Sequence, residues 1–240
     1  MNDFPLVGNM NNVVWVDPLI GNDSKATGKW GRPFKTLQKA HDCPLIRSGF
    51  GDEIHVQCSS SKYPEEIMDS VVISKKCVSF IGSGKSLRFH PAHGCSFIFL
   101  GGEGIEIRDF YMEGSGAGSG FGLNSYGGGW NVHHCWFENW PYAAMDVGHN
   151  GMFVDNEILN SNTALENGGG ALWSRGDNSK VARNIFRFCG SGGGVIGIHD
   201  GDGWIITDNI FVGTIGDGLD IDLHDSTNCV VARNILSDRS

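Results

Sequence analysis

Short apolar runs recur along the chain, separated by glycine, asparagine and aspartate. The runs are rich in Val, Ile, Phe and Trp and lack the roughly 3.6-residue period of a helix, which predicts short β-strands. Four segments share one pattern: an apolar pair, one or two polar residues, an asparagine, then an aliphatic residue or glutamate. The asparagines are Asn156, Asn184, Asn209 and Asn234, at spacings of 28, 25 and 25 residues. Such spacing indicates a structural repeat.

A repeat of about 25 residues cannot bury its apolar side alone, but a stack of such repeats can. Equivalent residues in neighbouring coils then lie about 4.8 Å apart, which is the distance between paired strands. The four asparagines would form a ladder at a corner, where an amide side chain can bond to the backbone or to the next asparagine. The repeat therefore predicts parallel β-helix coils over residues 51–240.

The N-terminal part of the chain interrupts this repeat. A strand is followed by a loop, by Pro33 and by a short amphipathic segment with Phe34, Leu37 and Ala40 on one face. A short helix of this kind can cover the apolar end of a coil stack. We therefore expect a cap over residues 13–50, preceded by an arm over residues 1–12 that docks onto a neighbour, all within a single domain.

Five motifs in this region carry a family resemblance. In order along the chain they are "WVDPLIGNDS", "GRPFKTLQKAHD", "GDEIHVQ", "YPEEI" and "CVSFIGSG". They resemble the N-terminal end of the right-handed parallel β-helix superfamily, the pectin-lyase-like proteins, and the later asparagine coils extend the resemblance over nearly the whole chain. It implies an all-β, single-stranded right-handed parallel β-helix. The fold carries lyases, hydrolases, epimerases, phage tailspikes and adhesins, so the resemblance does not choose an activity.

Charge and composition narrow the function classes. The net charge of −9 disfavours a protein that binds nucleic-acid backbones. The sequence shows neither a signal-peptide pattern nor a run of 18 apolar residues, so no membrane span is predicted. The seven cysteines include no CxxC pair, which favours small core residues over disulfides or a zinc site. We therefore expect that the protein is made in a reducing cytoplasm.

The acidic stretch "GLDIDLHDST" at residues 218–227 is the strongest candidate for chemistry. Counting back from the ladder asparagines gives two inward columns: Ala171, Ile196 and Ile221, and Trp173, Ile198 and Leu223. Because side chains alternate along a strand, Asp220, Asp222 and His224 are predicted to point outward. The same register gives further outward positions: Leu172 and Gly197 beside Asp222, Ser174 and His199 beside His224, and Asp146 in the column of Asp222. Gly197 would leave a gap there and make a shallow groove.

This outward face suits polysaccharide chemistry. Asp220 and Asp222 stand two residues apart, about 6.5–7 Å at Cα, and paired carboxylates can hydrolyse a glycoside. The predicted catalytic residues are thus Asp220, Asp222 and His224. The predicted ligand contacts are His199, Asp200, Asp146, Glu166, Trp173 and Arg175. No cofactor is required, although Asp220, Asp222 and a turn carbonyl offer ligands to Ca²⁺. The alternative is a plain solvated surface, because outward positions on any soluble β-helix are polar.

Three function classes stay open. The last repeat carries no cap after it, and similar phage tailspikes cover such an end by forming trimers. We therefore expect a phage or virion surface protein, tailspike-like or a decoration protein, that forms a homotrimer and contacts host polysaccharide. The alternatives are a polysaccharide-degrading hydrolase or lyase, and a secreted adhesin or scaffold. The corresponding locations are the virion, after synthesis in the host cytoplasm, or the extracellular space.

Overall fold

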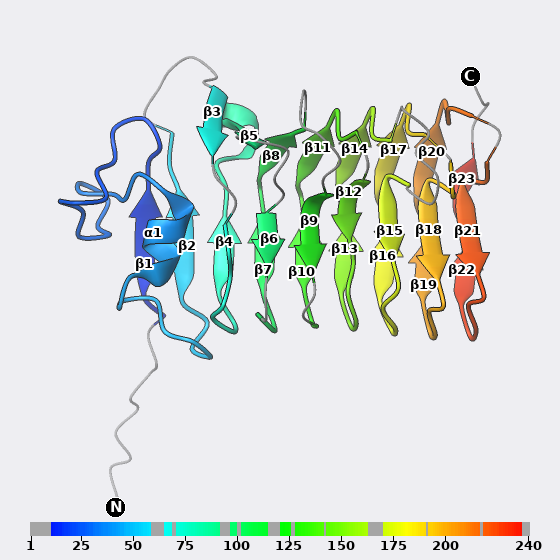
Figure 1. Ribbon diagram of the computed structural model, residues 1–240, viewed down its shortest axis with the longest axis horizontal. Helices are drawn as coiled ribbons and strands as arrows, with labels where there is room; N and C mark the ends of the chain where they lie inside the picture. Colours follow the sequence, from blue (N-terminus) through cyan, green and yellow to red (C-terminus); the bar gives the residue numbers. More distant parts are fainter. Residues whose placement is uncertain are drawn as a thin grey trace, which may run out of the picture.

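The computed structural model is a right-handed parallel β-helix, as the repeat predicts (Figure 1). It describes residues 11–58, 65–68, 71–91, 97–99, 102–114, 121–125, 128–141, 143–162, 170–190, 192–216 and 218–236. The coils stack along the long axis of the molecule, and the helix α1 (Leu37–Asp42) lies beside β1 and β2 at the N-terminal end. Every strand pair in these ranges is parallel, which is the pairing that successive coils require.

Three sheets run along the stack. Among the described residues, the first sheet holds nine strands: β1 (Val13–Val16), β2 (Glu53–Val56), β4 (Ser79–Ile81), β7 (Glu106–Arg108), β10 (Asn131–His133), β13 (Met152–Val154), β16 (Lys180–Ala182), β19 (Ile205–Thr207) and β22 (Val230–Ala232). The second holds eight there: β3 (Glu65–Met68), β5 (Arg88–Pro91), β8 (Tyr111–Glu113), β11 (Trp136–Glu138), β14 (Glu157–Leu159), β17 (Ile185–Arg187), β20 (Ile210–Val212) and β23 (Ile235–Leu236). The third holds six in the same ranges: β6 (Phe97–Phe99), β9 (Phe121–Ser125), β12 (Ala143–Asp146), β15 (Leu172–Ser174), β18 (Ile196–His199) and β21 (Ile221–His224). A short 3₁₀ turn, η1 (Gly84–Ser86), precedes β5.

The core is a set of apolar columns, one residue per coil. The central residue of most three-residue strands points inward. Because side chains alternate along a strand, its two neighbours then point outward. In the first sheet the inward column is Ile54, Phe80, Ile107, Val132, Phe153, Val181 and Ile206, all buried. In the second sheet Phe186 and Phe211 stack with ring centroids 5.1 Å apart. Each coil thus buries apolar surface only against its neighbours.

The asparagine ladder is present at the corner between the first and second sheets. The Oδ1 atom of Asn184 accepts hydrogen bonds from the backbone N (2.9 Å) and Nδ2 (3.1 Å) of Asn156. Asn209 and Asn234 repeat these contacts one and two coils further on, and Cys135 N donates to Asn156 at the other end. Each Nδ2 also donates to a backbone carbonyl at the corner, so that the ladder satisfies polar groups that the turn would leave unpaired.

The residue before each ladder asparagine occupies the left-handed backbone region. These residues are Asp155, Arg183, Asp208 and Arg233, with φ values of 57°, 57°, 61° and 56°. Their side chains alternate in charge from coil to coil. Arg183 Nη2 lies 2.7 Å from Asp155 Oδ2, and Arg233 Nε lies 2.6 Å from Asp208 Oδ1. We call these four residues the corner charges.

The cap forms as the sequence predicts. Thr36 begins α1 and its hydroxyl accepts from Lys39 N, while Leu37 and Ala40 are buried against the first coil. Asp52 fixes the preceding segment: its carboxylate accepts from Asn12 N (2.7 Å) and from Arg47 N, Nε and Nη2. These bonds, chiefly the one from the Arg47 side chain, hold the pKa of Asp52 at about 2 despite its burial. Residues 1–10 of the predicted arm lie outside the described residues.

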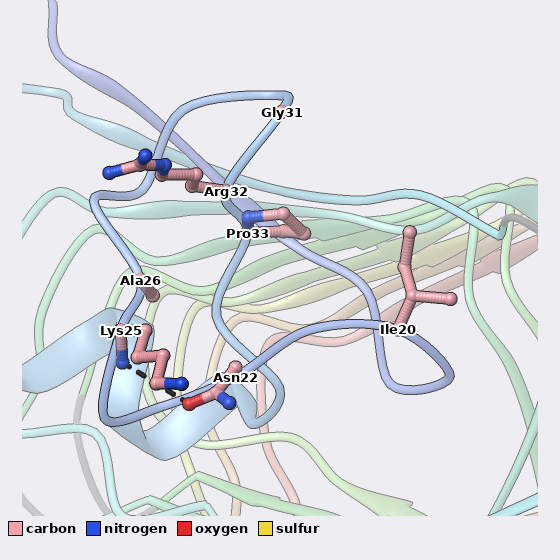
Figure 2. A pocket seen from close by; sticks show the side chains of 7 residues that line it. All are labelled: Ile20, Asn22, Lys25, Ala26, Gly31, Arg32 and Pro33. Atoms are coloured by element: carbon pink, nitrogen blue, oxygen red, sulfur yellow. Dashed lines mark hydrogen bonds between the residues drawn. The ribbon is translucent and has the colours of Figure 1, made fainter.

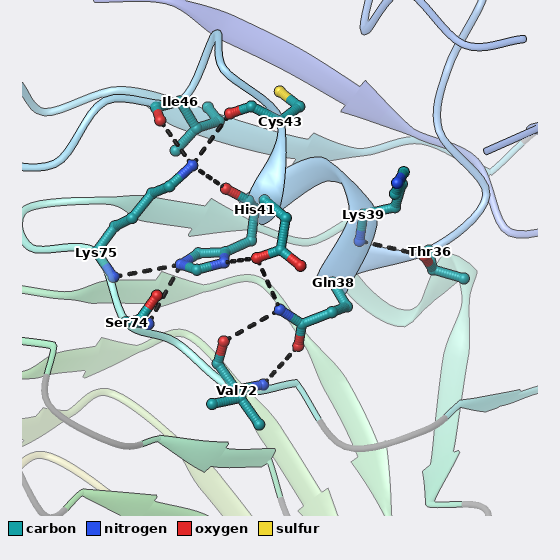
Figure 3. A network of polar contacts seen from close by, with 10 residues as sticks. Thr36, Gln38, Lys39, His41, Cys43, Ile46, Val72, Ser74 and Lys75 are labelled. Carbon is teal, nitrogen blue, oxygen red and sulfur yellow. Dashed lines mark hydrogen bonds and ion pairs between the residues drawn. The ribbon is translucent and has the colours of Figure 1, made fainter. Parts of the chain in front are cut away.

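A second polar network joins the cap to the coil that follows (Figure 3). Lys75 Nζ donates to three backbone carbonyls at the end of α1, those of His41, Cys43 (3.0 Å) and Ile46 (2.8 Å). The buried His41 ring contacts Asp42 Oδ1 through Nδ1, and its Nε2 accepts from Ser74 N and Lys75 N. Burial lowers the pKa of His41. The bond to His41 O satisfies a carbonyl of the last turn of α1 that has no partner within the helix, and the bonds to Cys43 and Ile46 hold the segment after it.

The cysteines in the described ranges are free thiols. Cys135 and Cys189 are fully buried, and burial raises the pKa of each thiol to about 12. They therefore act as small core residues, as the sequence indicates. No helix within the described part of the chain is long and apolar enough to cross a membrane.

Candidate functional site

The outward face of the third sheet collects most of the predicted site residues. The pairing of β9, β12, β15, β18 and β21 sets one outward column: Asn124, Asp146, Trp173, Gly197 and Asp222. A second outward column pairs His199 with His224, and Arg175 directly follows β15. The prediction that Asp146 shares a column with Asp222 is confirmed. We call this surface the third-sheet face.

The predicted orientation of Trp173 is wrong. Trp173 pairs with Gly197 and points outward, whereas Ser174 pairs with Ile198 and is buried. The stretch between β15 and its ladder asparagine is one residue shorter than in the next two coils, so counting back from Asn184 shifts the register by one. A one-residue shift moves every side chain to the opposite face of a strand. The partly exposed indole therefore becomes part of the third-sheet face.

The predicted orientation of Asp220 is also wrong. Its side chain is buried, with 8% exposure, and accepts a hydrogen bond of 2.5 Å from Thr214 Oγ1, while the neighbouring Leu219 is 57% exposed. Asp220 lies at the corner before β21, where the alternation of a strand does not hold. Asp222 and His224 do lie on the outward side of β21. Asp220 and Asp222 therefore do not face the solvent as a carboxylate pair.

Aromatic rings form a continuous strip across three coils of this face. The ring centroids of Trp173 and His199 lie 6.0 Å apart, and those of His199 and His224 lie 5.3 Å apart. The Arg175 guanidinium lies 5.1 Å from the indole of Trp173, within the range of a cation–π interaction. At the end of the strip, His224 Nε2 lies 3.3 Å from Asp225 Oδ2. The strip combines flat apolar rings with polar edges.

Two buried polar atoms on this face have no hydrogen-bond partner among the described residues. They are Asn124 Oδ1 and His199 Nε2. A buried polar atom without a partner costs about 1–3 kcal/mol, and such atoms are uncommon in folded proteins. Both lie on the same side of one sheet, three strands apart. Both atoms are enclosed by protein, so a ligand on the surface does not reach them in this conformation.

Asp146 has an unusual ionisation state for a surface aspartate. Burial raises the pKa of its carboxyl to about 7, and the charge of Arg175 offsets this only in part. At neutral pH the group is close to half protonated, so it can donate as well as accept a hydrogen bond. Strongly raised carboxyl pKa values are concentrated at functional sites.

Gly197 separates Trp173 from Asp222 along the outward column. A Cβ atom at this position would lie 2.7 Å from the carbonyl oxygen of Gly193 and 3.5 Å from Trp173 Cδ1. Only glycine fits there without a shift, because the carbonyl of Gly193 occupies the place of a side chain. The backbone of Gly193 fills the space beside Gly197, so the gap that the sequence predicts beside Asp222 is absent.

The geometry does not bring two carboxylates together on this face. Asp146 and Asp222 are separated by three strand spacings, about 14 Å at Cα. Asp200 is exposed in the left-handed turn after β18, and Glu166 lies outside the described residues. Within those residues there is also no group of three or more His, Cys, Asp or Glu side chains that could hold a metal ion.

Sequence reasoning missed a polar cluster on the second sheet. Glu113 and Glu138 pair directly across β8 and β11. Tyr111 Oη donates to Glu138, while Arg88 Nη1 (2.7 Å) and Asn139 Nδ2 (2.9 Å) donate to Glu113. The available signal was the spacing of 25 residues between "YMEG" and "WFEN", which gives the two glutamates the same place in the repeat.

The electrostatics of this cluster indicate a structural role. Burial raises the pKa of Glu113, but the hydrogen bond from Asn139 and the charges of Arg88 and His90 outweigh it and hold the pKa below its usual range. Burial and the neighbouring Glu138 raise the pKa of Tyr111 to about 12. Each carboxylate is thus engaged by its own neighbours, which stabilises two stacked glutamates that would otherwise repel each other.

No protein-family model matches the sequence, and neither does any curated protein. Among solved structures, the chain is similar to a GH136 lacto-N-biosidase from Eubacterium ramulus, with 9% sequence identity and a TM-score of 0.36. The match covers 94% of this chain and 67% of that enzyme's chain. The fold of the chain is a parallel β-helix of stacked coils.

Proposed function

We propose that the protein binds an oligosaccharide along the third-sheet face. The observation that carries this proposal is the outward column itself, in which the partly exposed Trp173 lies between Asp146 and Gly197. A partly exposed indole offers a flat apolar surface to the face of a sugar ring. This surface supports a glycan as the ligand.

The polar groups around Trp173 suit the hydroxyl groups of a sugar. Asp146 can donate or accept a hydrogen bond, and Arg175 can donate. Ligand sites combine an apolar platform with a few polar groups that set orientation. The column runs across successive coils, so that an extended glycan would lie along the axis of the solenoid.

Binding is better supported than cleavage. Glycoside hydrolysis usually needs two carboxyl groups about 5–9.5 Å apart, and Asp146 and Asp222 lie well beyond that range. Asp220 is turned inward to Thr214. Among the described residues, the carboxyl of Asp146, with its raised pKa, thus lacks a second carboxyl at the required distance on this face.

The replacement Trp173→Ala tests the proposal. We expect glycan binding to weaken about 5- to 30-fold, because the variant loses a stacking surface worth about 1–2 kcal/mol. The measurement is a screen on an array of neutral and acidic bacterial surface oligosaccharides, followed by titration calorimetry with the best binder. Trp136→Ala, on the outward side of the second sheet under Lys85, is the matched control and should bind normally. Equal binding by both variants would remove the indole from the site.

A further inference from the structure

Two adjacent histidines bring their ring nitrogens together on the outward side of the first sheet. His133 is the last residue of β10, and His134 follows it at the corner. Their Nδ1 atoms lie 2.7 Å apart, and their ring planes are nearly perpendicular, at 81°. The side chain of His133 is only 16% exposed, whereas His134 is exposed. The pair belongs to a different sheet from the third-sheet face.

The backbone of His134 explains why both rings face outward. Alternation along a strand would send adjacent side chains to opposite faces. His134 has a φ of 54°, in the left-handed region, and occupies the same corner place as Asp155 one coil further on. Strand β10 is paired on both sides, with β7 and β13, and Cys135 N donates to Asn156 Oδ1 (2.9 Å). The two histidines therefore stand on backbone that is fixed before and after them.

A carboxylate sets the proton positions within the pair. His133 Nε2 lies 3.0 Å from Glu106 Oε1. Burial raises the pKa of Glu106, but hydrogen bonds from His133 and Ser79 outweigh it and hold the pKa below its usual range. An ionised carboxylate only accepts hydrogen bonds, so Nε2 of His133 carries the proton and its Nδ1, in the neutral ring, presents a lone pair. The proton between the two Nδ1 atoms then belongs to His134.

The charges around the pair favour a cation in the place of that proton. The strand register puts His134 between Asp109 and Asp155, each at the same corner on a neighbouring coil. The charged groups nearest the two rings are three carboxylates and two guanidinium groups: Glu106, Asp109, Asp155, Arg108 and Arg183. Carboxylates thus outnumber guanidinium groups by one, and positive charge at the pair is stabilised.

We propose that His133 and His134 bind a divalent transition-metal ion through their Nδ1 atoms. Imidazole nitrogen is a ligand of Ni²⁺, Cu²⁺ and Zn²⁺. Histidines that bind metals usually donate their other ring N–H to a carboxylate, as His133 does to Glu106. The ion replaces the proton between the rings, and this proton moves to Nε2 of His134, because a neutral imidazole keeps one proton.

The distance between the nitrogens indicates which ions fit. Two nitrogens about 2.0–2.1 Å from one ion lie about 2.8–3.0 Å apart at right-angled positions and about 3.3 Å apart at tetrahedral ones. The observed 2.7 Å is closer to the right-angled arrangement, which Ni²⁺ and Cu²⁺ prefer. The exposed ring of His134 must tilt until both lone pairs meet at the ion, while Glu106 holds His133 in place.

The site has two protein ligands, and water fills the remaining positions of the ion. Glu106 is bonded to a ring and not to the ion, which agrees with the finding that no three metal-binding side chains converge within the described ranges. The proposal does not rest on glycan binding, because it uses none of the residues of the third-sheet face.

The test is titration of the whole chain with Ni²⁺ at neutral pH, after the exposed thiol of Cys77 is blocked with N-ethylmaleimide. Calorimetry gives the stoichiometry, and NMR of the histidine ring protons gives the location, because paramagnetic Ni²⁺ broadens resonances close to it. We expect one ion per chain, with His133 and His134 broadened first. His134→Asn should abolish this binding and keep the fold, since asparagine tolerates the left-handed backbone.

Two further variants separate the roles of the residues. Glu106→Gln should weaken Ni²⁺ binding about tenfold while the rings of His133 and His134 are still broadened, as expected for a positioning residue. His149→Asn is the matched control, because His149 is an exposed histidine beside Asp177 at another corner, and it should leave the binding unchanged.

Three outcomes would overturn the proposal. The first is no saturable Ni²⁺ binding by the unaltered chain. The second is equal binding by His134→Asn, which would remove the pair from the site. The third is an equal loss in His149→Asn, which would leave an adventitious ion only, spread over surface histidines.

Discussion

The variant Asn184→Ala should unfold with a free energy about 3–5 kcal/mol below that of the unaltered protein. Asn184 is fully buried, and its Oδ1 accepts two hydrogen bonds from Asn156 while its Nδ2 donates to Phe153 O and Asn209 Oδ1. Alanine leaves these groups without partners in a site that water cannot fill freely. Urea denaturation followed by circular dichroism measures the change.

Asn234→Ala is the internal control for the ladder. Asn234 makes the same bonds to Asn209 and to Ile206 O, but it lies in the last described coil and is only partly buried. Water can replace its amide there, so the loss should be about 1 kcal/mol. Equal losses in the two variants would mean that the ladder acts through the unfolded chain and not through buried hydrogen bonds.

The variant Asp146→Asn should be more stable than the unaltered protein at pH 8, by on the order of 2–4 kcal/mol. Burial raises the pKa of Asp146 from 3.8 to about 7 in the folded state. The unfolded chain therefore gives up its proton first, and stability falls as the pH rises from about 4 to about 7. Asparagine carries no charge at any pH and avoids this loss. Denaturation curves at pH 4 and pH 8 measure the difference, which should be small at pH 4.

Asp200→Asn is the matched control for this effect. Asp200 lies two coils away in an exposed turn with φ of 57°, a conformation that asparagine also tolerates. Its replacement should change stability little at either pH. A gain for Asp146→Asn that is the same at pH 4 and pH 8 would show that ionisation is not the cause.

A gain in stability at Asp146 would itself be informative about function. Natural proteins retain a destabilising group mainly where activity or binding needs it. The same variant should then bind the glycan more weakly than the unaltered protein above pH 7, where the carboxylate accepts hydrogen bonds that an amide cannot fully replace. Stability and binding would thus change in opposite directions at one residue.

The fold could be predicted because each coil repeats the same arrangement of inward apolar residues and corner turns. The recurrence of asparagine at Asn184, Asn209 and Asn234 marks one corner, and the apolar columns follow from alternation along each strand. The errors come from places where the repeat is irregular. Trp173 was assigned to the wrong face because its coil is one residue shorter, and Asp220 because it belongs to a corner and not to a strand.

The remaining features depend on contacts that no periodic pattern encodes. The raised pKa of Asp146 depends on burial by neighbouring coils, which the sequence does not state. The shape of the loop before α1, drawn in Figure 2, depends on hydrogen bonds such as that from Asn22 N to Pro33 O, which no repeat predicts. The pair Glu113 and Glu138 was visible in the repeat spacing, but its partner Arg88 comes from an earlier coil without the asparagine pattern.

The corner charges also constrain how this solenoid can change in length. Asp155, Arg183, Asp208 and Arg233 place opposite charges on successive coils. Loss or duplication of a single coil would bring two aspartates or two arginines into contact at this corner, whereas a change of two coils preserves the alternation. Each mismatch costs little by itself, because these side chains are near the surface. Insertions and deletions in this part of the protein should nevertheless be best tolerated in units of two coils, because an even number preserves the alternation of charge.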